Sequence, residues 1–259
     1  MKKHTQRGRH RGKPVDRDAR DKTERRVGFS PKLAILYEDD AVVVLDKPAG
    51  LLAVPIKGSS TPSALTLLSS RLSTKKQPAL VVHRIDRFAT GALLFAKTPR
   101  DRATLIRQFL DHTPVREYLV VVRGHLGSQS GTLVHHFSRQ GMYQQQRSAS
   151  DPKASRAELR FIVEQTFPKA TLVRVQLVTG LQNQIRAQFA AEGHPVIGDR
   201  KYRQSESSEK LIDRVALHAT HLEFVHPRTE KTVVVDCPPP ADFRNLLEGL
   251  SRSNPRGRI

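Results

Sequence analysis

The segment Val81–Thr98 reads VVHRIDRFATGALLFAKT and sets a charged turn between two apolar runs. The runs Leu80–Val82 and Gly91–Ala96 are predicted to be strands, because short apolar stretches beside polar turns are typical of a buried sheet. Similar strand-like runs recur along the chain at hairpin-length gaps, with only a few helical patterns between them. This order favours the α+β class, with a large mixed, mostly antiparallel β-sheet flanked by helices, over a doubly wound parallel sheet.

Three helices are predicted from their start and stop signals. Thr61-Pro62 and Thr98-Pro99 each place a capping hydroxyl before a proline at the first helical position, and the first of these helices is predicted to reach Leu72. A third helix is predicted from about Asn183 to Glu192. Gly193 after it suits the left-handed conformation that often ends a helix.

The composition limits the class of protein. The chain has 259 residues, with 44 Lys and Arg against 25 Asp and Glu, so its net charge is 44 − 25 = +19. This excess favours nucleic acid as the partner, with an anionic membrane surface second. The single cysteine, Cys237, excludes a disulfide framework or a cysteine-based zinc site within one chain. With no apolar run near the ~20 residues of a membrane helix and no secretory signal, we expect a cytoplasmic protein, and nothing demands more than a monomer.

The two ends of the chain are basic. Residues 1–26 carry 11 basic and four acidic side chains, a net charge of 11 − 4 = +7, and show no helical or strand period. We therefore predict a disordered basic arm over 1–30 and a shorter basic tail over 251–259, with a globular domain over 31–250 between them. The arm could bind phosphates or serve only solubility. The rest of the chain is basic in its own right, because 19 − 7 = +12.

Asp86 is the one carboxylate in the turn of the opening segment. Arg84 and Arg87 lie on either side of it, and His83 is a third candidate cation. Neighbouring cations keep a carboxylate ionised, and an ionised carboxylate can serve as a nucleophile or a base. The alternative is that Asp86 only neutralises Arg84 or Arg87 in a surface turn, and the spacing does not decide between the two.

Two further segments carry candidate residues. In Val178–Tyr202, Arg186 lies at the edge of the buried face of the predicted helix, where it could pair with a buried carboxylate or simply extend into solvent. Tyr118 lies near the start of the predicted strand Glu117–Val122, where most tyrosines only pack. The chain has no G-x-G-x-x-G, Walker A, H-E-x-x-H or G-x-S-x-G motif, so a nucleotide or zinc cofactor has no support in the sequence.

Three segments in order resemble motifs of the RluA-type family of RNA pseudouridine synthases. They read LYEDDAVVVLDKPAGLLAVP at 36–55, HRIDRFATGALLFAKT at 83–98 and TGLQNQIRAQFAAEGHPVIGDRKY at 179–202. The resemblance runs from about Ile35 to Pro240, and it is to bacterial members that lack an S4 domain. Two stretches depart from the family pattern. Phe88-Ala89-Thr90 stands where Asp-Thr-Ser is usual, and Leu181-Gln182-Asn183 stands where Arg-x-His is usual.

The resemblance implies the pseudouridine synthase fold, with residues 31–250 as its catalytic domain. It implies that a uridine of rRNA or tRNA is flipped out, that its glycosidic bond is broken, and that C5 is rejoined to the ribose, with no metal, nucleotide or redox cofactor. By matched position, Asp86 is the expected catalytic aspartate and Arg186 the basic residue that pairs with it. Tyr118 is expected to pack against the base and to assist proton removal, and Arg84 to fill the gap that the base leaves.

There is an alternative to the interpretation as an enzyme. A protein on the same fold could have lost catalysis and act as an RNA-binding or ribosome-assembly protein, and the altered motif neighbours keep that possibility open. Loops such as Gly141–Pro152 are expected to carry the RNA preference.

Overall fold

The computed structural model describes residues 33–58, 61–74, 77–141, 143–202 and 211–252 of the chain. The predicted arm over 1–30 and most of the predicted tail lie outside these residues. The described part holds eleven strands and four helices in the order β1 (Ala34–Glu38), β2 (Val42–Lys47), α1 (Ala64–Ser73), β3 (Leu80–Val81), β4 (Thr90–Ala96), α2 (Pro99–Leu110), β5 (Val115–Arg123), β6 (Ser130–Gln140), β7 (Tyr143–Gln146), β8 (Ser155–Phe167), β9 (Ala170–Leu177), α3 (Gln184–Ala191), β10 (Leu217–Val225), β11 (Thr232–Asp236) and α4 (Ala241–Arg252). None of these helices is long and apolar enough to cross a membrane.

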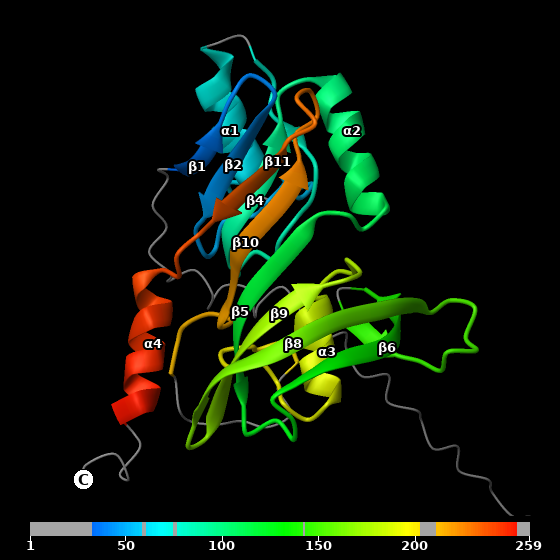
Figure 1. Cartoon of the computed structure of the whole chain (residues 1–259), viewed down its shortest axis with the longest axis vertical. Helices are drawn as coiled ribbons and strands as arrows, with labels where there is room; N and C mark the ends of the chain where they lie inside the picture. The colour runs from blue at the N-terminus through cyan, green and yellow to red at the C-terminus, as the bar shows by residue number, and fades with distance from the viewer. Residues whose placement is uncertain (1–32, 59–60, 75–76, 142, 203–210, 253–259) are drawn as a thin grey trace, which may run out of the picture.

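The strands form one long sheet. Its order is β1-β2-β4-β10-β5-β9-β8-β6-β7, with β11 against β10 and β3 against β4. The pair β4 and β10 is parallel, at His218 opposite Thr90 and Ala219 opposite Gly91, and the other strand pairs are antiparallel. In Figure 1, α1 and α2 lie at the β1-β2-β4 end of this sheet, while α3 and α4 lie toward the other end. The predicted α+β class with a mixed, mostly antiparallel sheet is confirmed.

Strands β2 and β4 are covered on both faces. Val43 and Leu45 of β2 pack with Leu68 of α1, whereas Val42 and Val44 pack in a second cluster with residues of α2 and β11. Because side chains alternate between the two faces of a strand, a strand buried on both faces needs a continuous apolar run. This explains the uninterrupted AVVVL and GALLFA of the sequence.

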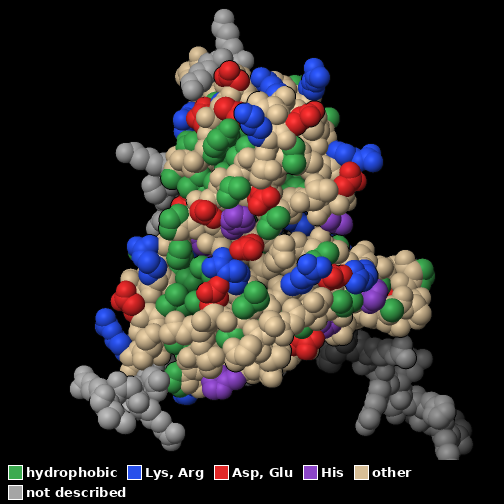
Figure 2. All heavy atoms as spheres, in the orientation of Figure 1, with side chains coloured by type: hydrophobic (Ala, Val, Ile, Leu, Met, Phe, Trp, Pro, Cys, Tyr) green, Lys and Arg blue, Asp and Glu red, His purple; other side chains and the backbone are tan. Residues whose placement is uncertain are grey.

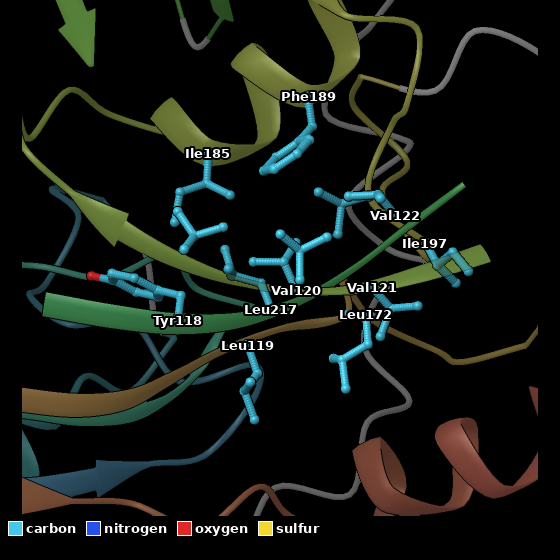
Figure 3. Close-up of a cluster of buried hydrophobic side chains, with 14 of the residues drawn as sticks. Tyr118, Leu119, Val120, Val121, Val122, Leu172, Ile185, Phe189, Ile197 and Leu217 are labelled. Atoms are coloured by element: carbon cyan, nitrogen blue, oxygen red, sulfur yellow. The ribbon is translucent and has the colours of Figure 1, made fainter. Parts of the chain in front are cut away.

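The largest core cluster lies around β5, β9 and α3. Ile185 and Phe189 of α3 point from the helix onto alternate residues of β5, while Leu119 lies on the opposite face of the sheet (Figure 3). Tyr118 lies at the edge of this cluster, with its hydroxyl directed away from the aliphatic side chains (Figure 3). The packing that builds the core therefore also holds the Tyr118 ring at the edge of the hydrophobic cluster.

The helices differ from the predictions in two places, the start of α1 and the presence of α4. The first helix begins at Ala64, not after Thr61, because the Ser63 hydroxyl accepts a hydrogen bond from the Thr66 amide and forms the cap itself. Helix α2 begins as predicted, with Thr98 as its cap and Pro99 at its start. Helix α4 was not predicted, although Phe243, Leu246 and Leu250 recur along it and are buried against the main core.

Candidate active site

Asp86 and Arg186 face each other across the start of α3. Asp86 lies in the turn that leads from β3 to β4, and Arg186 lies in the first turn of α3. Nη1 of Arg186 donates a hydrogen bond of 2.9 Å to Oδ2 of Asp86, and the side chains are 12% and 18% exposed. Among the described residues, this is the one hydrogen bond that the Asp86 side chain receives. Its Oδ1 atom therefore accepts no hydrogen bond from the part of the chain that the structure describes.

A second carboxylate, Asp199, takes the other edge of the Arg186 guanidinium. Nε and Nη2 of Arg186 donate to the two carboxylate oxygens of Asp199 at 2.7 and 2.8 Å. Oδ1 of Asp199 also accepts hydrogen bonds from the backbone amides of Lys201 and Tyr202. Burial by itself would lower the pKa of Arg186, but the hydrogen bonds and charges of Asp199 and Asp86 raise it. Arg186 is therefore a permanent cation between two carboxylates.

Lys47 fastens the Asp86 turn to the end of β2. Its fully buried ammonium donates to the carbonyl oxygens of Pro48, Leu51 and Arg87 at 2.9 to 3.0 Å. The Arg87 carbonyl belongs to the residue that follows Asp86, so the three bonds tie two loops together. Burial lowers the pKa of Lys47, and the charge of Asp86 opposes that shift. Sequence reasoning missed this contribution, although the Lys-Pro-x-Gly turn was the signal for it.

The Tyr118 side chain is held on β5 and is only 7% exposed. Burial raises the pKa of its hydroxyl, the charge of Arg116 opposes the increase, and the charge of Asp86 adds to it. The phenol is therefore protonated at neutral pH. A carboxylate with a free oxygen, near a protonated phenol and a fixed cation, can act as a nucleophile or a base while the phenol carries a proton.

None of the three cations predicted around Asp86, His83, Arg84 and Arg87, pairs with its carboxylate in the part of the chain that the structure describes. His83 was a candidate cation, and this prediction is wrong, because burial and the charge of Arg116 lower its pKa to about 3. Nε2 of His83 instead accepts a hydrogen bond from the Leu94 amide. Arg87 donates through Nε to the Gly50 carbonyl, and Arg84 is exposed. The carboxylate therefore pairs with Arg186 from a distant segment and with neither neighbouring arginine.

The two stretches that differ from the family pattern, 88–90 and 181–183, contribute contacts near the pair of Asp86 and Arg186. Asn183 has a φ of 55°, which asparagine tolerates better than most residues, and its Oδ1 accepts a hydrogen bond of 3.1 Å from Arg186 Nη1. Leu181 packs against a small buried cluster on β6, β8 and α3. Thr90 Oγ1 lies 2.8 Å from Nδ1 of the buried His218. The altered neighbours thus leave the pair of Asp86 and Arg186 intact.

An aromatic and basic cluster lies beside Arg186. The Arg186 guanidinium lies over the Tyr202 ring, 5.5 Å from its centroid. The Lys201 ammonium lies 4.7 Å from the centroid of Tyr143 and 5.7 Å from that of Tyr202. Tyr143 is about half-exposed and belongs to β7, so these contacts join the hairpin of β6 and β7 to the start of α3. The segment Gly141–Pro152, which is expected to be a loop that carries the RNA preference, therefore lies partly beside Lys201 and Tyr202. The expectation of a loop is wrong for Tyr143–Gln146, which pairs with β6 as strand β7.

Comparisons with known proteins agree on one family. The family model described as RNA pseudouridylate synthase matches residues 41–191. An uncharacterized RNA pseudouridine synthase YhcT of Bacillus subtilis is 33% identical over 219 residues, which are 83% of this chain and 71% of that protein. The ribosomal large subunit pseudouridine synthase D of Zymomonas mobilis is 32% identical over 236 residues, which are 86% of this chain and 74% of that protein.

A solved structure supports the same fold. The human RNA pseudouridylate synthase domain containing 4 superposes with a TM-score of 0.71 at 20% identity, over 84% of this chain and 92% of that one. The match to the family model covers both the Asp86 turn and the first turn of α3. The similarity to the two bacterial relatives extends over most of the chain. The chain therefore belongs to the RluA-type family of RNA pseudouridine synthases.

Proposed function

We propose that this protein isomerises specific uridines of structured RNA to pseudouridine, with Asp86 as the catalytic aspartate. The observation that carries the proposal is the geometry at Asp86. One carboxylate oxygen is held at 2.9 Å by Arg186, the other receives no hydrogen bond from the described residues, and the Tyr118 phenol lies within electrostatic reach. The carboxylate is thus oriented while one of its oxygens can reach a substrate.

The reaction is an isomerisation and consumes no second substrate. The bond between N1 of uracil and C1′ of ribose breaks, with Asp86 acting on the sugar or on its proton. The uracil turns within the pocket and C5 forms the new bond to C1′. The proton on C5 then leaves, and N1 gains a proton, so atoms and charge balance. Tyr118 packs against the base, and its hydroxyl oxygen accepts the proton from C5 while its own proton passes to Asp86 or to water.

Access to the uridine requires that its base leave the RNA stack, which costs a few kcal/mol. Arg84 is exposed beside the Asp86 turn, and we assign to it the gap that the flipped base leaves. A planar guanidinium can stack between neighbouring bases in place of the missing one. This role makes Arg84 a residue for substrate binding.

Ribosomal RNA is the proposed substrate class, with transfer RNA as the alternative. Several relatives are named ribosomal large subunit pseudouridine synthases, among them synthase C of Escherichia coli, which is 33% identical over 227 residues. A Vibrio vulnificus relative that is 30% identical over 214 residues is named a dual-specificity RNA pseudouridine synthase. We place the enzyme in the cytoplasm, where both substrates are found, and propose that it acts as a monomer.

The N-terminal segment is proposed to add affinity for RNA without sequence preference. The face of the body drawn in Figure 2 mixes Lys and Arg with Asp and Glu, whereas residues 1–26 carry a net charge of +7. Removing these residues should weaken binding to RNA and flatten its dependence on salt, because each phosphate contact contributes to the salt slope. Binding measured at several salt concentrations tests this, and an unchanged slope would reduce the segment to a solubility tail.

The decisive experiment maps pseudouridines in the total RNA of the source cell. The wild type is compared with strains that carry only the Asp86→Ala or the Asp86→Asn protein. We expect one or a few defined sites to disappear in both variants while the protein stays at its normal level. An unchanged map, with no paralogue that modifies the same sites, would refute the enzyme and leave an RNA-binding or ribosome-assembly protein.

A further inference from the structure

Asp199 is the most completely satisfied carboxylate near the proposed active site. Its side chain is fully buried, and its two oxygens accept two hydrogen bonds from Arg186 and two from backbone amides. The backbone donors belong to Lys201 and Tyr202, which lie two and three residues after it in the loop after α3. Asp199 is therefore rigid and cannot itself reach a substrate.

The two carboxylates accept unequal numbers of hydrogen bonds from Arg186. Asp199 occupies the edge formed by Nε and Nη2 with two bonds, whereas Asp86 receives one bond, from Nη1. A bidentate pair is stronger and more directional than a single end-on bond. Asp199 thus neutralises the guanidinium and also sets its orientation, so Asp86 is held by a weaker bond to a cation that is already paired.

This division has a consequence for Asp86. If Arg186 were free, the lowest-energy arrangement would be a bidentate pair with Asp86, which would occupy both oxygens of Asp86. Because Asp199 prevents that arrangement, Asp86 keeps one oxygen and much of its charge for the substrate. Asn183 limits Nη1 further, since its side-chain oxygen accepts a hydrogen bond from the same atom at 3.1 Å.

We propose that Asp199 is a positioning residue for the reaction, which acts through Arg186 to keep Asp86 singly bonded and available. The inference rests on the proposed function, since it assigns to Asp86 the role of the reacting carboxylate. A purely structural Asp199 would affect stability, but it would leave the rate of a folded enzyme unchanged.

The test compares Asp199→Asn with a matched variant, Asp101→Asn. Asp101 is also buried, and it also accepts two hydrogen bonds from one guanidinium, that of Arg228, but it lies at the start of α2. The substrate is total RNA from cells that lack the gene, which retains the unmodified uridine. Single-turnover rates and RNA affinities are measured for each folded variant.

We expect Asp199→Asn to lower the single-turnover rate about 10- to 100-fold while RNA affinity changes less than about threefold. Asp101→Asn should lose a comparable amount of stability and keep the wild-type rate. If Asp199→Asn turns over at the wild-type rate, or if both variants lose the rate equally, the inference is overturned. A wild-type protein that forms no pseudouridine would instead refute the proposed function.

A second variant and a second readout separate charge from packing. Asp199→Ala leaves a buried space beside the guanidinium, and we expect formate to restore part of its rate whereas neutral formamide does not. In a crystal structure of Asp199→Asn without RNA, we expect Arg186 to turn and to bind both oxygens of Asp86. An unchanged guanidinium in that structure would contradict the inference whatever the activity of the wild type.

Discussion

The ammonium of Lys47 lies 2.9 Å from the carbonyl oxygen of Arg87, the residue that follows Asp86, although 40 positions separate the two in the chain. Replacing Lys47 by Met would leave the buried carbonyl oxygens of Pro48 and Leu51 without their donor, whereas the Arg87 carbonyl would keep the hydrogen bond from the Gly50 amide. We expect the free energy of unfolding to fall by about 2–4 kcal/mol, because unsatisfied buried acceptors are costly. Unfolding in urea measures the loss. Turnover of the folded fraction should fall as well, since the Asp86 turn is then held to the loop after β2 only through the hydrogen bonds between Gly50 and Arg87.

Lys97→Met supplies the control for this prediction. Lys97 is also buried, and its ammonium pairs with Glu38 at 2.9 Å, but it lies at the other end of β4 from Asp86. We expect it to lose stability and to keep the turnover of its folded fraction. Equal turnover in the two variants would show that Lys47 contributes to stability alone.

Most strands and helices could be predicted from the sequence for a physical reason, although β7 falls in the segment 141–152 that is expected to be a loop. Strands β2 and β4 are buried on both faces, so the runs 41–45 and 91–96 are apolar without interruption. Helices α2 and α3 carry local start or stop signals that do not depend on the rest of the fold. Helix α4 was missed, although the recurrence of Phe243, Leu246 and Leu250 was available as a signal.

The site was harder to predict, because its partners are distant in sequence. The pairing of Asp86 with Arg186 entered through the resemblance, and spacing alone left a surface turn equally open. Nothing local distinguishes Asp199 from a loop aspartate, since its four hydrogen bonds come from an arginine 13 positions away and from two amides. The prediction that His83 is a cation was wrong because only the fold buries its ring and places Arg116 close to it.

The stability of the protein should depend on His83 at mildly acidic pH. The folded state holds His83 neutral, with its pKa lowered to about 3, whereas in the unfolded chain it binds a proton below about pH 6.5. The unfolded state thus binds more protons between these values, so stability from this group is full above pH 6.5 and is lost as the pH falls toward 3. Between pH 6.5 and pH 5 the loss should be about 1–2 kcal/mol.

The His83→Gln variant isolates this contribution. It removes the titration while leaving the carboxylates of the protein in place, so the difference in unfolding free energy between the two proteins is the quantity to follow. That difference should change by about 1–2 kcal/mol from pH 6.5 to pH 5, to the disadvantage of the wild type. Parallel pH curves for the two proteins would mean that His83 titrates normally in the folded state.

The parallel contact between β4 and β10 requires the absence of a side chain at residue 91. Gly91 has a φ of +109°, and a Cβ atom there would lie 2.2 Å from the carbonyl oxygen of Ala219. Both the strained backbone and the clash with backbone atoms oppose a substitution, so Gly91→Ala should cost about 3 kcal/mol or more. Gly249→Ala in α4 is the reference, because no atom outside its chain neighbours and its own helix backbone lies within 4 Å of its added Cβ atom. Urea unfolding measures the stability of the two variants. A Gly91→Ala protein as stable as the reference would contradict the described register of β4 and β10.

Tyr118→Phe separates the two roles proposed for Tyr118. The ring packs in the main core and the phenylalanine ring has the same shape, so RNA affinity and stability should change little. The hydroxyl is protonated at neutral pH, because burial raises its pKa, so it relays a proton by passing its own proton on as its oxygen accepts the one from C5. Without it, the single-turnover rate should fall about 100-fold, the lower end of what a positioned acid or base contributes.

Tyr37→Phe is the matched control for the loss of a phenol. The Tyr37 hydroxyl donates a 2.7 Å hydrogen bond to Asp39, and this bond raises its pKa to about 12, but the residue packs with the α2 side of the sheet. Its removal should leave the single-turnover rate unchanged. If Tyr118→Phe also keeps the wild-type rate, Tyr118 only packs against the base, and the proton from C5 must leave through Asp86 or through water.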